Sequence, residues 1–219
     1  MPAAHPTSPE LEALLDQGRL AELRGQDQAA RDLYERALHS LAAGTPAWTI
    51  ARLLLGVGRT HMSSRNAGAA LDCVEAVLAL PQEHGMDVAV AEALELRGRV
   101  RWREGMLAAA GEDFTDARQR ARLAGRPGLA ALAATHLGDL ALLRGDISGA
   151  ISLSELALNE YRTAGDEALA GLTAARLATL YADAKRWNAA EQAFADAAAS
   201  ATQRRDEHLL ALLEIARAE

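Results

Sequence analysis

The chain has 219 residues, half of them apolar but only 4% aromatic, so alanine and leucine supply most of its apolar character. This mixture favours helices over strands, and we expect an all-α protein. A formal net charge of -7 argues against a general nucleic-acid binder and against a protein held on an anionic membrane surface, because either needs a broad basic face.

The N-terminal stretch MPAAHPTSPE has no basic region followed by an apolar core, so it does not predict a secretory signal. We expect residues 1–9 to form a flexible tail. No apolar run approaches the roughly 18 residues that a membrane span needs. The single cysteine, Cys73, has no internal disulfide partner and no metal-ligand spacing around it, which indicates a reducing compartment. These features predict a soluble, cytoplasmic protein.

The first stretch that resembles a site is LLLGVGRT, residues 53–60. An apolar run followed by Gly-x-Gly is compatible with a strand that enters a phosphate-cradling loop. The third glycine of the dinucleotide pattern is missing, because His61 stands three positions after Gly58. A P-loop needs a lysine after its second glycine, and the only lysine in the chain is Lys185.

Repetition provides another interpretation of Gly58. Small residues recur every 40 residues at Gly18, Gly58, Gly98, Gly138 and Ala178. Two more columns follow the same step: Ala30, Ala70, Ala110, Ala150 and Ala190, then Ala37, Val77, Ala117, Ala157 and Ala197. A nucleotide-binding glycine would occur once, so these columns indicate residues that pack five repeats together.

Each repeat reads as two helices. The first stretch, such as LEALLDQGRLAELRG, has a glycine in mid-helix, which costs about 1 kcal/mol relative to alanine and therefore predicts close approach of a neighbouring helix. The second, such as AARDLYERAL, places alanine, an aromatic residue and alanine on one helix face. Breaks within the pairs are expected at Gly25, Gly105 and Gly145, with Asn66 and Arg186 near the equivalent place, and breaks between pairs at Gly44, Gly85, Gly125 and Gly165.

These columns resemble the tetratricopeptide repeat over about residues 11–206. The 40-residue period is longer than the standard unit and is similar to the elongated repeats in sensor and scaffold domains of bacterial transcription activators and signalling ATPases. The resemblance implies a right-handed superhelical solenoid of five helix-turn-helix repeats at residues 10–206, a capping helix at 207–219, and a concave groove that binds other proteins. Ser154 replaces the aromatic residue of the fourth repeat, and Arg97 and Arg101 occupy columns that are apolar elsewhere, so the third repeat is expected to pack differently.

A stripe of first-helix residues left free by this packing would line the groove. One of its columns reads Arg19, Arg59 and Arg99, then Asp139 and Thr179. Stacked arginines suit a carboxylate-rich segment, since guanidinium groups pair with carboxylates in a bidentate way. Trp102 and Arg103 complete the predicted partner site, an exposed tryptophan beside guanidinium groups being a common interface anchor. The alternatives are that the arginines are ordinary solvated groups and that Trp102 belongs to the core.

The sequence therefore predicts a non-catalytic scaffold that binds a protein or peptide, with an acidic segment as one candidate. No catalytic constellation, metal ligand set or cofactor is predicted, because the histidines are scattered; His136 and Asp139, one helical turn apart, are interpreted as a surface contact. Neither direct nucleic-acid contact nor membrane contact is expected. The alternative function is a small-ligand-sensing regulatory module of a bacterial signalling or transcription system.

The last stretch, EHLLALLEIARAE, begins a sixth unit without its second helix. We expect Leu209, Leu212, Leu213 and Ala216 to pack on the fifth repeat. Leu210 and Ile215 then lie on another face, where two interpretations stay open. Either they are partly covered at the edge, or they form a homodimer through the C-terminal helix.

Overall fold

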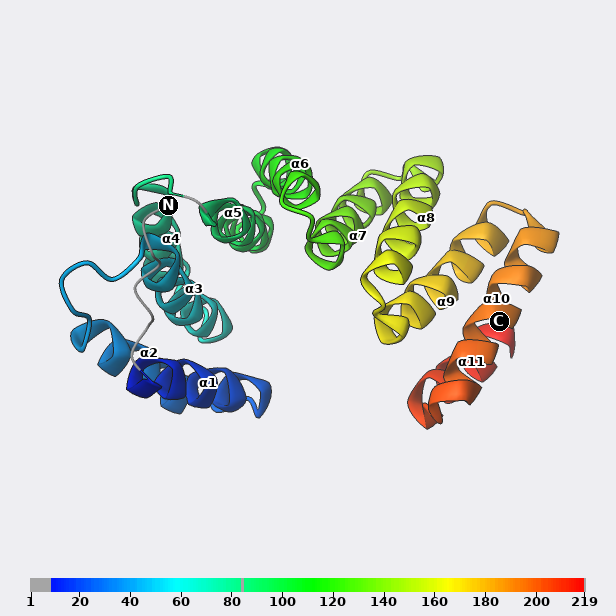
Figure 1. Ribbon diagram of the computed structural model, residues 1–219. Helices are drawn as coiled ribbons and strands as arrows, with labels where there is room; N and C mark the ends of the chain where they lie inside the picture. Colours follow the sequence, from blue (N-terminus) through cyan, green and yellow to red (C-terminus); the bar gives the residue numbers. More distant parts are fainter. Residues whose placement is uncertain (1–8, 84, 219) are drawn as a thin grey trace. The chain divides into compact units, whose positions relative to one another are not determined.

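The computed structural model describes residues 9–83 and 85–218, and every regular element within these ranges is an α-helix (Figure 1). The all-α architecture predicted from the composition is confirmed. The helices are α1 Pro9–Leu23, α2 Asp27–His39, α3 Ala47–Ser63, α4 Ala67–Leu78, α5 Met86–Arg103, α6 Leu107–Leu123, α7 Pro127–Leu143, α8 Ile147–Ala164, α9 Glu167–Asp183, α10 Trp187–Arg204 and α11 Glu207–Ala218.

Consecutive helices form the pairs that the 40-residue columns predict, beginning with α1 and α2, and α11 follows the fifth pair. We refer to the odd-numbered helices as first helices and to their even-numbered partners as second helices. The chain divides into two compact units between Arg120 and Ala121, a boundary inside α6. Unit 1 contains α1 to α5 and most of α6, and unit 2 contains the end of α6 and α7 to α11.

Each turn within a pair contains one residue with left-handed backbone. This residue recurs every 40 positions, with φ between 58° and 79°, at Gly25, Arg65, Gly105, Gly145 and Lys185. Sequence reasoning named Asn66 and Arg186 near these places, but both are the N-caps of the following helices. Asn66 suits that role because its side chain accepts a hydrogen bond from the Ala69 amide at 3.2 Å. Arg65 and Lys185 therefore occupy a conformation that favours glycine.

In unit 1, the ring of Tyr34 on α2 lies between two glycines of neighbouring first helices. A Cβ atom added to Gly18 of α1 would lie 2.5 Å from Tyr34 Cε1, and one added to Gly56 of α3 would lie 2.6 Å from Tyr34 Cε2. The ring is only 2% exposed. Phe114 of α6 lies against one such glycine, Gly98 of α5, with 2.6 Å from an added Cβ to the ring. Glycine thus lets the aromatic ring lie on bare helix backbone.

Gly58 also lies inside α3, where an added Cβ would be 3.0 Å from Leu96 Cδ2 and 3.2 Å from Cys73 Cβ. Both glycines of LLLGVGRT are therefore in mid-helix, so this stretch does not form a phosphate-cradling loop. The alanine columns are buried as well: Ala30, Ala70, Ala110, Ala150, Ala178 and Ala190.

In the described part of unit 2, the contact between a mid-helix glycine and an aromatic ring is not repeated. Ser154 occupies the aromatic position of the fourth pair, and an added Cβ at Gly138 would lie no closer than 3.5 Å to its Oγ. In the fifth pair the glycine is replaced by Ala178, and Phe194 is only half-buried. Neither pair of unit 2 therefore combines a mid-helix glycine with an aromatic ring at these positions.

The C-terminal helix α11 packs on α9 and α10, but not through all of the expected leucines. Leu209 and Leu213 are buried, and Leu210 is partly buried against the same cluster. The expectation that Leu212 packs inward is wrong, because it is 43% exposed. The buried sector of the helix is centred nearer Leu213, which turns Leu212 outward. Ile215 and Ala216 lie outside the described side chains.

We expect Gly98→Ala to lower the free energy of unfolding by about 1–3 kcal/mol, because the new methyl group would overlap the Phe114 ring. Gly138→Ala is the matched control. Its methyl group meets only ordinary contacts, so helix propensity should raise stability by up to about 1 kcal/mol. Urea unfolding followed by circular dichroism measures both, and equal midpoints would contradict the packing role of Gly98.

Lys185→Gly should raise the free energy of unfolding by about 0.5–1 kcal/mol, since glycine adopts the left-handed backbone of this turn without steric cost. Gly145→Ala at the equivalent turn should have the opposite effect. Thermal melting of the two variants checks the sign, and a lower melting temperature for Lys185→Gly would show that its side chain matters more than its backbone.

Candidate functional site

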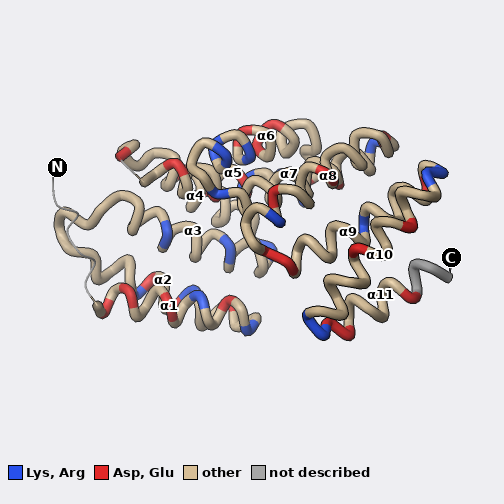
Figure 2. The backbone as a smooth tube through the Cα atoms, turned by 45° about the vertical axis from the view of Figure 1, so that its right-hand side comes forward, with Lys and Arg blue, Asp and Glu red and all other residues tan. Residues whose placement is uncertain are grey.

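All five side chains predicted for a partner site belong to first helices of unit 1. Arg19 lies on α1, Arg59 on α3, and Arg99, Trp102 and Arg103 on α5. Arg19 and Arg103 are exposed, whereas the other three are half-buried. On α1, Arg19 lies among four acidic positions (Figure 2). The predicted residues therefore lie among charges of both signs.

Arg59 is held by Glu22, a residue of the preceding repeat. Its Nε and Nη2 donate to the two carboxylate oxygens of Glu22, both at 2.9 Å. The hydroxyl of Tyr34 donates to Glu22 Oε2 at 2.5 Å. The Glu22 side chain is only 18% exposed, so this charged group is largely withdrawn from water. The three side chains connect α1, α2 and α3 and extend the buried Tyr34 packing to the surface.

The environment of Glu22 favours its ionised form. Burial by itself raises the pKa of the carboxyl, but the hydrogen bonds from Arg59 and Tyr34 and the positive charge of Arg59 outweigh burial and lower the pKa below its ordinary value of 4.5. Burial and the adjacent carboxylate together raise the pKa of the Tyr34 hydroxyl. Glu22 is thus ionised and Tyr34 is a neutral donor near neutral pH.

Other arginines of this surface also have acidic neighbours. Arg99 lies 3.6 Å from Glu95 one turn earlier, and Arg52 of α3 lies 3.6 Å from Glu12 of α1. The Arg52 guanidinium is also 5.7 Å from the centre of the Trp48 ring. Arg59 and Arg99 are thus each paired with a carboxylate. The neighbouring column alternates in sign across the three first helices, with Glu12, Arg52 and Glu92.

The third pair packs through a buried ionic cluster. Asp113 of α6 is 2% exposed, and both Arg97 and Arg101 of α5 donate to it at 2.8 Å. Sequence reasoning singled out the two arginines in apolar columns but missed Asp113. A signal was present, because the equivalent positions hold Leu33 and Cys73 in the earlier repeats.

Trp102 is neither a fully exposed interface residue nor a fully buried core residue. Its ring is half-buried and meets the core residue Phe114 edge-on, with centroids 6.3 Å apart and planes at 82°. The geometry is a favourable aromatic pair. Trp102 as a whole is half-buried, and the next residue, Arg103, is exposed.

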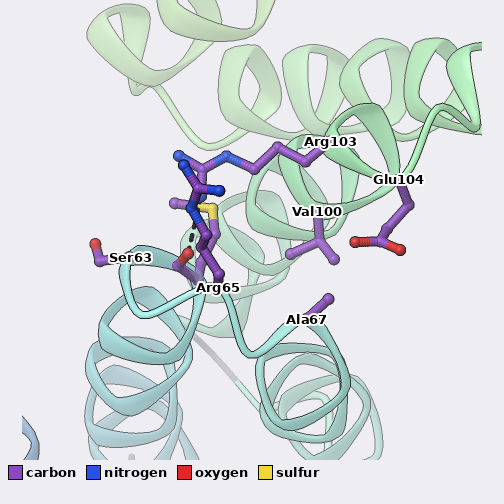
Figure 3. Close-up of a pocket in the computed structure, with 7 residues that line it drawn as sticks. Ser63, Arg65, Ala67, Val100, Arg103 and Glu104 are labelled. Carbon is purple, nitrogen blue, oxygen red and sulfur yellow. Dashed lines mark hydrogen bonds between the residues drawn. The ribbon is translucent and has the colours of Figure 1, made fainter.

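Arg103 reaches back to the preceding pair and lines a pocket of about 530 Å³ (Figure 3). Its Nη1 donates to the Met62 carbonyl at the end of α3, at 2.8 Å. Arg65, the left-handed residue of the following turn, lines the same pocket. Sequence reasoning did not single out Arg65. Its signal was an arginine in a column that holds glycine in three other repeats.

The equivalent stripe in unit 2 is less charged. The positions that hold Glu12, Arg52 and Glu92 in unit 1 hold leucines on α7, α9 and α11, namely Leu132, Leu172 and Leu212. Leu172 and Leu212 are each 43% exposed. One turn further along, Arg176 of α9 forms an ion pair with Asp139 of α7, while His136 lies 4.0 Å from the same carboxylate. The His136 and Asp139 contact thus belongs to a cross-helix ion pair.

Within residues 9–83 and 85–218, no group of three or more histidine, cysteine or acidic side chains is arranged to hold a metal ion. Among the helices described, none combines the length and the apolar character that crossing a membrane requires.

Comparison with known proteins identifies the fold. Neither a protein-family model nor a curated protein matches the sequence. A Rap protein complexed with competence and sporulation factor is similar in structure, with TM-score 0.75 and 15% identity over 95% of this chain and 59% of that one. A thermophilic tetratricopeptide repeat protein from Thermus thermophilus gives TM-score 0.64 and 23% identity over 95% of this chain and 100% of that one.

A signal-transduction ATPase from Pyrococcus horikoshii, which has a tetratricopeptide repeat sensor, gives TM-score 0.73 and 17% identity over 94% of this chain and 32% of that one. This chain thus spans about three-fifths of the Rap protein and about a third of the ATPase. These likenesses show that the chain has the tetratricopeptide-type helical-repeat fold. Proteins built from such repeats typically mediate protein–protein interactions.

The ion pair of Glu22 and Arg59 should make stability depend on pH. Because the pKa of Glu22 is lowered by folding, its stabilisation is fully present above the pKa of the unfolded chain and is lost as the pH falls through the folded pKa. We expect Glu22→Gln to cost about 1–3 kcal/mol at pH 7, with the difference from wild type shrinking steadily below about pH 4.5.

Urea unfolding of wild type and variant across this pH range measures the effect. Glu12→Gln is the control, since Glu12 and its partner Arg52 are 37% and 41% exposed and should contribute little at any pH. A Glu22→Gln cost that did not change with pH would contradict the proposed role of the carboxylate charge.

Proposed function

We propose that this protein is a non-catalytic interaction scaffold that binds a segment of a partner protein on the first-helix surface of unit 1. One observation supports the proposal: three successive first helices carry arginines that are exposed or half-buried and lie outside the apolar core. They are Arg19 on α1, Arg52 and Arg59 on α3, and Arg99 on α5. An extended segment contacts several repeats at once. Arginines on the first helices of three successive pairs are suited to bind such a segment.

The pairing of these arginines refines the chemistry of the partner. A purely acidic segment would compete with Glu22 for Arg59 and with Glu95 for Arg99. A segment that carries both acidic and basic residues avoids this loss, because it meets complementary charges on both partners of each ion pair. Arg19 is the most accessible arginine of the column, so a carboxylate of the partner is placed there.

Trp102 and Arg103 extend this proposed surface on α5. A half-buried indole already fixed against Phe114 loses little conformational freedom when a partner covers its remaining edge. Arg103 is exposed but anchored to the Met62 carbonyl, so its free N–H groups are likewise positioned before binding. Both residues are therefore suited to act as anchors.

The pocket beside Arg103 favours a second candidate function, a regulatory module that senses a small ligand. Its volume of about 530 Å³ is within the range of small-molecule sites. The two functions differ in the ligand: the scaffold binds a protein segment, and the sensor binds a small compound.

Co-purification from the native cell, with mass spectrometry of the retained proteins, tests the scaffold. We expect Arg19→Glu combined with Arg99→Glu to reduce the retained partner at least about tenfold, a loss of about 1.4 kcal/mol, because two contacts become repulsive. Arg36→Glu combined with Arg120→Glu is matched in charge but lies on second helices, and it should retain the partner.

Circular dichroism of both double variants checks that helicity is kept. Equal retention of every protein by the two variants would contradict a partner site on the first-helix surface. Loss of the partner only in the second-helix variant would place binding on the other face.

A further inference from the structure

The pocket in unit 1 brings two guanidinium groups together. It lies where the end of α3, the start of α4 and the end of α5 meet, and it is lined by Arg65 and Arg103 among others. Figure 3 shows the two guanidinium groups gathered on one side of the pocket. Neither forms an ion pair with another side chain in the described part of the chain. Two adjacent positive charges create a local potential that attracts an anion.

Arg103 is fixed in this position by the protein itself. One of its N–H groups donates to the Met62 carbonyl at 2.8 Å. A guanidinium group has five N–H donors, so most of them remain for a ligand. Because the side chain is already held, binding does not have to order it.

Arg65 has its side chain on a backbone that favours glycine. Its φ is 60°, and the equivalent turn residues Gly25, Gly105 and Gly145 have the same left-handed conformation without a side chain. An arginine here is strained relative to glycine. Strain of this kind is a reason to look for a role of the side chain.

We infer that this pocket binds an oxyanion, either a carboxylate or a phosphate group, between the guanidinium groups of Arg65 and Arg103. Guanidinium groups present paired N–H donors that match the oxygens of both anions. Ser63 also lines the pocket, but its hydroxyl points away from the two guanidinium groups in Figure 3. The inference rests on the second candidate function proposed above for this pocket and names the chemical class of its ligand; it requires no partner protein.

The rest of the lining limits the kind of ligand. Val100 and Ala67 provide an apolar wall across the pocket from the guanidinium groups. Glu104 lines the pocket too, but its carboxylate points to the other side of Val100 in Figure 3. A ligand with one oxyanion and a short apolar part fits this arrangement, whereas a polyanion would meet the Glu104 charge.

Titration of the full chain with inorganic phosphate and, separately, with acetate tests the site. The readout is the set of arginine Nε–H signals in nitrogen-15 NMR spectra, at constant ionic strength adjusted with sodium chloride. We expect the Arg65 and Arg103 signals to shift and saturate with a Kd on the order of 1–10 mM for at least one anion. The exposed Arg120 of α6 is the internal control and should not saturate.

Variants separate anion binding from folding. Arg65→Gly removes the guanidinium while keeping a residue that prefers the left-handed turn, so it should abolish the saturable shift of Arg103 without lowering the melting temperature. Arg103→Gln should abolish the shift of Arg65. Glu104→Gln should tighten binding severalfold, since it removes the only carboxylate among the residues that line the pocket.

The two anions distinguish the sources of the ligand. Tighter binding of phosphate supports a phosphorylated compound or segment, and equal or tighter binding of acetate supports a carboxylate of a ligand or partner. Shifts that do not saturate for either anion, or that match those of Arg120, would overturn the site. Unchanged binding in both Arg65→Gly and Arg103→Gln would overturn it as well.

Discussion

The contact between an aromatic ring and bare helix backbone determines how the repeats of unit 1 pack. Tyr34 can lie between α1 and α3 only because Gly18 and Gly56 have no side chains, and Phe114 lies against Gly98 for the same reason. Glycine in mid-helix lowers helix propensity, but the buried ring offsets that loss through area removed from water and close packing. Where the ring is absent, as at Ser154, the first helix leaves more space.

Polar contacts extend this packing toward the surface. The hydroxyl of Tyr34 reaches Glu22, which holds Arg59 of the next repeat, so a core ring is connected to a charged first-helix surface. Asp113 with Arg97 and Arg101 does the same between α5 and α6. A buried ion pair of this kind contributes less to net stability than its distances suggest, because desolvation opposes the attraction. Removing one partner is costly nonetheless, so these contacts favour one specific pairing of helices.

The same repeat positions carry different chemistry in the two units. Charged residues of unit 1 are replaced by Leu132, Leu172 and Leu212 in unit 2, while the buried alanine columns continue through both. Packing therefore constrains the columns of buried residues and leaves the columns of exposed residues free to vary. For this reason the fold, which the similar solved structures share at low sequence identity, does not by itself identify a partner, and function has to be argued from the columns of exposed residues.

The sequence by itself determined the all-α class, the 40-residue period and the helix pairs, because burial of small and aromatic residues recurs locally with the helix period. It did not reveal that Arg59 pairs with Glu22, 37 positions earlier, or that Arg65 and Arg103 share a pocket. It named Asn66 and Arg186 near the turns of the second and fifth pairs but not the left-handed residues Arg65 and Lys185 beside them, and it turned Leu212 inward. Those features depend on how neighbouring helices are placed and rotated against each other. Only the tertiary structure decides this, since a charged side chain has partners within reach on several helices and the packed backbone selects among them.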